Sequence, residues 1–263
     1  MTKSKIAGNS ADKWKQRLKL ELGLADEFMG LTADEWRKKL SRKRLVSDNY
    51  DTVISLDWPH YCGHATRGCG GPAGWCYTLG GQIGGNQARS LRAAMTDRLA
   101  RDYPSVFAEI VHREILLFTK NNKLAYPNIR FSGSGEVHQA HFSALISLKE
   151  KGVHLWGFSR NPKLAIDLRD QGISVLFSCD ATTPKKTLDF AQENGLKLAY
   201  TSLGVKDTPS FDAFVVFPVH RSGRVREIAD TRNVCPKISQ EFLTGRRKPA
   251  SCQQACTLCH QIV

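Results

Sequence analysis

Hydrophobic positions along the chain form short continuous runs that alternate with stretches at helical spacing. The runs are typical of buried strands, and most are followed by apolar residues three or four positions apart. We expect strands at residues 50–57, 128–132, 153–158, 173–177, 196–200 and 213–217. We expect helices between them at residues 87–101, 105–119, 139–150, 162–170 and 184–193. This alternation predicts an α/β fold with a parallel sheet built from βαβ units.

The pattern does not by itself say how the sheet closes. We favour a curved, partial (β/α)6 TIM-like barrel over an open doubly wound sheet, and periodicity is consistent with both. In either fold, ligands bind at the C-terminal ends of the strands. We expect this unit over residues 49–220, preceded by a basic helical extension over 1–48 and followed by a cysteine-rich, metal-binding tail over 221–263.

The clearest helix start lies in the extension. Thr32 and Glu35 have the spacing of a capping box, in which each side chain serves the backbone N–H of the other residue. Leu31 and Trp36 occupy the hydrophobic positions on either side of the cap. The helix then enters residues 37–44, where six of eight residues are basic and suit a helix C-terminus.

Composition limits the class of protein and its partners. No apolar run approaches the ~20 residues of a membrane span, and the N-terminus has no secretory signal, so we expect a cytoplasmic protein without a membrane partner. The net charge of +13, concentrated toward both ends, favours a nucleic acid partner, DNA or RNA, over an ordinary solvated surface. In the cytoplasm, eight cysteines indicate metal binding or catalysis more than disulfides.

The glycine-rich loop after the first strand holds the first group of metal-ligand candidates. Cys62, Cys69 and Cys76 are each separated by six residues, and five glycines and a proline lie between or beside them. Three thiolates can hold three irons of a 4Fe–4S cluster and leave the fourth open. A zinc ion would require a fourth ligand, which His60 or His64 could supply. Burial of the cysteines as small hydrophobic residues is disfavoured, because the glycines offer no apolar surface.

The second strand is followed by a glycine pair and a carboxylate. Gly133, Ser134 and Gly135 would let the backbone approach a cofactor closely, and Glu136 could bind an ammonium group or act in catalysis. Later strand ends add two candidate cofactor-binding residues, Ser159 and Ser178, and two candidate catalytic residues, Cys179 and Asp180. Turn formation and helix capping are the alternative for the polar side chains, and a plain strand-end thiol for Cys179.

This arrangement resembles the radical S-adenosylmethionine (SAM) enzymes. Members carry three cysteines after the first strand, an aromatic residue before the last cysteine, here Trp75, and a Gly-Gly-Glu-type motif after the second strand. The resemblance implies a partial (β/α)6 barrel in which Cys62, Cys69 and Cys76 hold a 4Fe–4S cluster. It also implies that residues 133–136 bind SAM, whose reductive cleavage yields a 5′-deoxyadenosyl radical, and that an electron-donor protein is a further partner. The spacing departs from the three and two intervening residues common in the superfamily.

The tail contains a second cysteine group. Four thiolates suit a structural zinc ion or an auxiliary 4Fe–4S cluster. The four residues are Cys235, Cys252, Cys256 and Cys259. The last three have the superfamily's own spacing and are an alternative location for the open cluster. The chain as a whole resembles a phage-borne family called gene product 88, which suggests a mobile-element origin.

Three functions therefore remain in competition. The first is an iron–sulphur, radical-SAM-like enzyme that modifies a nucleic acid or nucleotide. The second is a zinc-dependent base-exchange enzyme resembling the tRNA-guanine transglycosylases, with Asp180 or Asp230 as the candidate nucleophile. The third is a non-catalytic, metal-stapled protein that binds nucleic acid.

Overall fold

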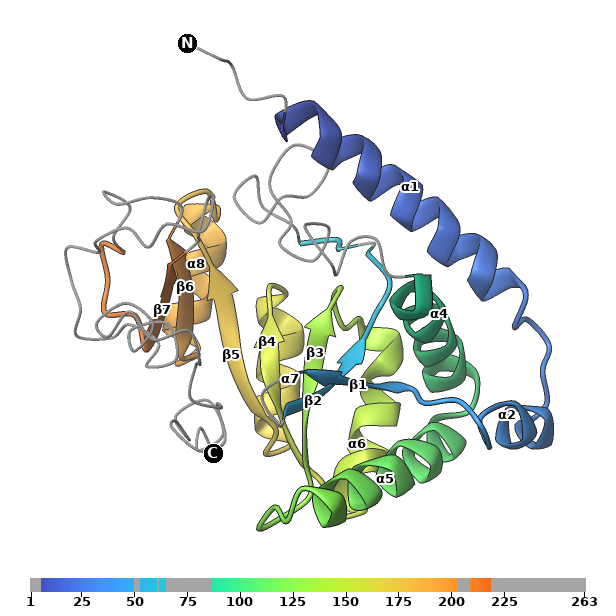
Figure 1. The fold of residues 1–263 in the computed structure, drawn as a ribbon. Coiled ribbons are helices and arrows are strands. Elements are labelled where there is room, and N and C mark those ends of the chain that lie inside the picture. Colours follow the sequence, from blue (N-terminus) through green and yellow to red (C-terminus); the bar gives the residue numbers. More distant parts are fainter. Residues whose placement is uncertain (1–5, 50–52, 61, 65–86, 203–208, 219–263) are drawn as a thin grey trace, which may run out of the picture.

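A seven-stranded sheet forms the centre of the molecule (Figure 1). The structure is a computed structural model that describes residues 6–49, 53–60, 62–64, 87–202 and 209–218. The strands are β1 (Val46–Asn49), β2 (Val53–Asp57), β3 (Asn128–Ser134), β4 (His154–Ser159), β5 (Ser174–Cys179), β6 (Leu198–Ser202) and β7 (Val215–Pro218). They lie side by side in the order of the sequence. All neighbours from β2 to β7 are parallel, and β1 runs antiparallel to β2.

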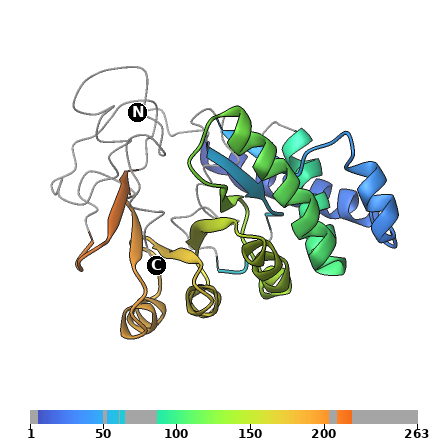
Figure 2. The ribbon, with the colours of Figure 1, turned by 90° about the horizontal axis from the view of Figure 1, so that it is seen from below.

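Helices link the parallel strands and cover the sheet. They are α4 (Gln87–Asp102), α5 (Pro104–Asn121), the 3-10 turn η2 (Gln139–His141), α6 (Phe142–Glu150), α7 (Pro162–Asp170) and α8 (Lys185–Glu193). Helices α6, α7 and α8 lie on the same face of the sheet (Figure 2). The strand order also never reverses, whereas a doubly wound sheet reverses at its switch point. The predicted α/β class with a mostly parallel sheet is confirmed, and the sheet is not closed into a barrel.

The N-terminal region forms two helices, α1 (Ile6–Asp26) and α2 (Ala33–Lys39). The predicted capping box of α2 is confirmed, because the Thr32 side chain accepts from the Glu35 backbone and the Glu35 carboxylate accepts from Thr32 N at 2.7 Å. Trp36 is fully buried and packs against Phe28 with ring centroids 5.5 Å apart. Helix α1 packs along α4, so these helices form a second layer beside the sheet.

Strand β1 was not anticipated from the sequence, which placed residues up to 48 in a helical extension. It begins directly after the basic run, and its entry is fixed by the Glu114 carboxylate of α5. Glu114 accepts from the backbone N–H groups of Leu45 and Val46 at 3.1 Å. Of the helices in the described ranges, none combines the length and hydrophobicity that crossing a bilayer requires.

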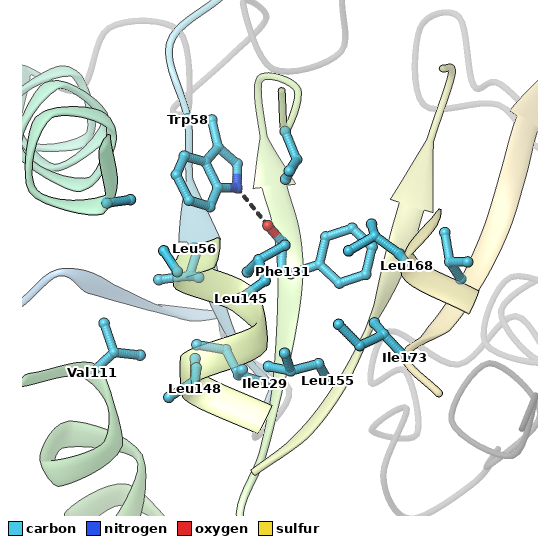
Figure 3. Close-up of a cluster of buried hydrophobic side chains, with 14 of the residues drawn as sticks. Leu56, Trp58, Val111, Ile129, Phe131, Leu145, Leu148, Leu155, Leu168 and Ile173 are labelled. Carbon is cyan, nitrogen blue, oxygen red and sulfur yellow. Dashed lines mark hydrogen bonds between the residues drawn. The ribbon is translucent and has the colours of Figure 1, made fainter. Parts of the chain in front are cut away.

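The main core lies between the sheet and its helices (Figure 3). Leu56, Ile129 and Phe131 of the sheet meet Leu145 and Leu148 of α6, and all five are fully buried. Each such side chain contributes about 1.5–3 kcal/mol through burial. Trp58, which follows β2, extends this core to the C-terminal ends of the strands. Its indole Nε1 donates to the Phe131 carbonyl at 2.5 Å.

Candidate functional site

Three buried carboxylates lie at the C-terminal ends of the parallel strands. Asp57 ends β2, Glu136 follows β3 and Asp180 follows β5. Because these strands are neighbours or near neighbours in the sheet, their ends lie along one edge. Together with Ser134 and Arg160, these acids form what we call the strand-end rim. The sequence pointed to Glu136, Ser134 and Asp180 but not to Asp57, which looks like an ordinary polar residue at the end of a strand.

The two glycines of the β3 motif have a packing role. A Cβ atom on Gly133 would lie 2.4 Å from Ser55 Oγ and 2.8 Å from the Leu56 carbonyl oxygen of β2. Gly135 has a φ of +68°, and its Cβ would lie 2.0 Å from the Trp58 carbonyl oxygen. Both positions therefore require glycine so that β3 and β2 can approach each other. Their expected contact with a cofactor stays a prediction.

Ser134 orients the Asp57 carboxylate. Its hydroxyl donates to Asp57 Oδ1 at 2.8 Å, and the Ser47 hydroxyl of β1 donates to Oδ2. The Nε atoms of Arg89 and Arg92, on the first turns of α4, each lie 3.8 Å from Oδ2. Burial lowers the pKa of Arg92, against the attraction of Asp57. This network joins α4 to β1, β2 and β3 and accounts for Ser134 without a ligand.

Glu136 is 6% exposed, and its two carboxylate oxygens differ. Oε1 accepts from the backbone N–H of Arg160 at 3.0 Å. Oε2 is buried and has no hydrogen-bond partner among the described residues. The His64 backbone N–H is a donor to the same carboxylate but leaves Oε2 unsatisfied. Burial raises the pKa of Glu136, against the lowering by Arg160 and His64. A buried carboxylate oxygen without a donor is uncommon in folded proteins, and a donor on a bound molecule is one way to satisfy it.

A histidine pair supports the turn after Glu136. The His141 ring is fully buried and stacks on Trp58 at 4.3 Å between centroids. Its Nε2 lies 2.7 Å from Asp97 Oδ1, and its Nδ1 accepts from the His138 backbone at 3.1 Å. With both ring nitrogens engaged, His141 anchors the turn. Burial lowers the pKa of His138 to about 4, with the nearby His141 and Arg101 acting in the same direction.

Arg160 connects the ends of β4 and β5. Its Nη1 donates to Asp180 Oδ2 at 2.9 Å, while Asp180 Oδ1 accepts from the Thr182 backbone at 2.8 Å and its hydroxyl at 2.7 Å. Both oxygens of Asp180 thus have donors, which leaves the carboxylate poorly disposed to attack a substrate. At the start of α7, Asn161 is the helix cap, and Ser159 bonds to the Asn161 backbone. The contacts of Ser159 are thus those of a turn and helix cap, the alternative to cofactor binding that the sequence left open.

The two candidates on β5 point to opposite faces of the sheet. Cys179 is fully buried in the main core, and its thiol donates to the Ala199 carbonyl at 3.7 Å. Burial raises its pKa to about 12. This placement accounts for Cys179 as a core residue, and we assign it no catalytic role. Ser178 alternates with the core residues Phe177 and Cys179, so it faces away from the helices, and it is half-buried.

Of the predicted metal ligands, only Cys62 lies in the described part of the chain, where it is half-buried. The others lie outside the described residues: Cys69, Cys76, Cys235, Cys252, Cys256 and Cys259. Within the described ranges, no group of three or more histidine, cysteine or acidic side chains could hold a metal ion. Cys62 is nevertheless only two residues before His64 in the sequence, and the His64 backbone lies beside Glu136. The start of the cysteine loop and the carboxylate therefore share the strand-end rim.

His60, the other histidine considered for zinc, contacts α1. Its Nδ1 lies 3.0 Å from Oε1 of Glu21 and 3.1 Å from Oε2, and its backbone N–H donates to Oε2 at 2.8 Å. Arg17 donates to Glu21 Oε1 at 2.6 Å. Glu21 could not be recognised from the sequence, because nothing in an amphipathic helix indicates which acid is buried against a distant segment. Comparison of the chain with family models, curated proteins and solved structures found no match.

Proposed function

We propose that this protein is an iron–sulphur enzyme of the radical-SAM type, acting on a nucleic acid or nucleotide. The observation that carries the proposal is the pairing of Glu136 with the start of the cysteine loop at one rim. A buried carboxylate with one unsatisfied oxygen suits the ammonium group of a small zwitterion. Cys62, the first cysteine of the loop, is two residues before His64, whose backbone contacts this carboxylate.

Two of the described residues, Cys62 and Glu136, have the chemistry that a 4Fe–4S cluster and the amino group of SAM require; Cys69 and Cys76 lie outside the described residues. In the proposal, Cys62, Cys69 and Cys76 hold a 4Fe–4S cluster, and Glu136 holds the methionine amino group of SAM. The cluster, when bound, supplies the electron for reductive cleavage of SAM. Arg160 keeps Glu136 aligned through its backbone, and Asp57 keeps the end of β3 in register through Ser134. The glycines contribute by bringing β3 against β2, rather than by opening a cradle.

The finer architecture belongs to the same proposal. Six parallel strands in sequential order, with α6, α7 and α8 on one face, support a partial (β/α)6 barrel. In that arrangement, the face away from the helices is the interior. It carries the half-buried Ser178 and the half-buried rings of Phe158 and Phe217. Polar and aromatic side chains together suit a nucleotide-like substrate.

The basic residues support the nucleic acid part of the proposal. Within residues 37–44, Arg37 is committed to local ion pairs, with Asp34 at 2.9 Å and Glu109 at 3.0 Å. Lys38, Arg42, Lys43 and Arg44 are exposed. Exposed lysines and arginines at this density attract phosphates without reading sequence.

The test is purification without oxygen, followed by metal analysis, an absorbance spectrum and incubation with SAM and a reductant. We expect several irons per chain, broad absorption near ~400 nm and release of 5′-deoxyadenosine. Cys62→Ala should lose iron, whereas the matched substitution Cys179→Ala in the core should keep it. Glu136→Gln should keep iron and slow SAM cleavage. A colourless protein that contains zinc, or iron retained in full by Cys62→Ala, would refute the proposal.

A further inference from the structure

The acid Glu21, on helix α1, is completely buried and satisfied by two separate parts of the chain. On its own helix, it accepts from Arg17 Nε at 2.6 Å. Across 39 residues of sequence, it accepts from the His60 backbone at 2.8 Å and contacts the His60 ring at 3.0 Å. A buried carboxylate is tolerated only when its oxygens find donors, and here both oxygens do. The contact therefore fixes His60 in both backbone position and ring orientation.

His60 stands two residues before Cys62, and His64 stands two residues after it. Two residues of extended chain reach at most about 7 Å, so a fixed His60 restricts where the Cys62 backbone can lie. At the other side, the His64 backbone approaches Glu136 of the strand-end rim. The two histidines on either side of Cys62 thus each contact a buried acid: His60 contacts Glu21 of α1, and the His64 backbone contacts Glu136 after β3.

We propose that Glu21 is a positioning residue for Cys62, acting through His60 to hold Cys62 at the strand-end rim beside Glu136. This inference rests on the proposed function, and it gives a part in the site to helix α1, which the sequence placed in a basic helical extension. Carboxylates that hydrogen-bond to metal ligands typically contribute roughly 10–100-fold in metal affinity or activity. Because Glu21 acts one step further out, through His60, we expect an effect at the lower end of that range.

The experiment compares Glu21→Gln and Glu21→Ala with a matched control, Glu27→Ala, in the full-length protein. Glu27 is an exposed acid just beyond the same helix. Each variant is reconstituted with iron and sulphide without oxygen, and its iron affinity and the electron paramagnetic resonance (EPR) spectrum of the reduced protein are measured. We expect Glu21→Ala to lose about tenfold in iron affinity with an altered EPR spectrum, Glu21→Gln to lose less, and Glu27→Ala to match wild type.

Hydrogen exchange separates positioning from packing. If Glu21 positions the loop, exchange in residues 58–64 accelerates in folded Glu21→Gln while β3 and α4 stay protected. Wild-type EPR and loop exchange in Glu21→Gln, or exchange that rises equally throughout α1 and α4, would overturn the inference. If wild-type protein takes up no iron, the proposed function fails. In that case, hydrogen exchange in residues 58–64 is the remaining test of whether Glu21 positions this segment.

Discussion

The sharpest test of the rim geometry is the substitution Gly135→Ala. A methyl group at this position would lie 2.0 Å from the Trp58 carbonyl oxygen and 2.7 Å from that of Pro59. Trp58 has little freedom to move aside, because its backbone N–H bonds to the Ser134 carbonyl at 2.8 Å and its indole bonds to Phe131. The substitution therefore forces β3 and the segment after β2 apart.

The loss in unfolding free energy caused by Gly135→Ala has two parts, backbone strain and steric clash, and a matched control separates them. Gly152 has a φ of +80°, but nothing lies within 4 Å of the Cβ position, so Gly152→Ala carries the backbone strain alone. That strain costs about 1–2 kcal/mol. Gly135→Ala carries the same strain at its φ of +68° plus a clash with the backbone, and forced overpacking adds about 1–3 kcal/mol or more. We expect losses of about 2–5 kcal/mol for Gly135→Ala against about 1–2 kcal/mol for Gly152→Ala.

Urea unfolding followed by circular dichroism gives both free energies of unfolding, and thermal scans give a second measure. For a domain of this size, each kcal/mol corresponds to roughly 2–4 °C in Tm. The difference between the two variants is the quantity of interest, because it cancels the shared strain. If Gly135→Ala proved no less stable than Gly152→Ala, the close approach of β3 to Trp58 would be wrong, and with it the placement of Glu136 at the rim.

Three further outcomes follow from the ionisation of buried groups. Because burial raises the pKa of Glu136 above its usual 4.5, its contribution to stability falls as pH rises through that raised pKa. Glu136→Gln should therefore gain stability relative to wild type between pH 4.5 and 7.5 in urea unfolding, and a constant difference would contradict this. The pKa of His138 is lowered from 6.5 to about 4, so stability should fall as pH drops across that interval, and His138→Gln should flatten the slope. With a thiol pKa near 12 in the core, Cys179 should resist iodoacetamide at pH 8 until the protein unfolds, as peptide mass analysis would show.

Features that depend on neighbours in sequence were predictable. The capping box of Thr32 and Glu35 involves residues three apart, so its residue types are enough to place the start of α2. The alternation of apolar runs with helical spacing likewise predicted the parallel α/β class. Strands that are buried on both faces are continuously apolar, and this pattern can be seen in the sequence. Strand β1 escaped notice, because its four residues pair with β2 and carry little apolar signal of their own.

The candidate site depended on tertiary structure for a physical reason. The sequence indicated that Glu136 and the cysteine loop follow successive strands, and hence that both belong at one edge of the sheet. It could not show that Oε2 of Glu136 is left without a donor among the described residues, since satisfaction of a buried oxygen depends on every atom around it. It also could not show that Cys179 faces the core or that Glu21 reaches His60 across 39 residues. Local periodicity determines which segments form helices and strands, whereas the close approach of side chains from distant segments determines which polar groups remain available for chemistry.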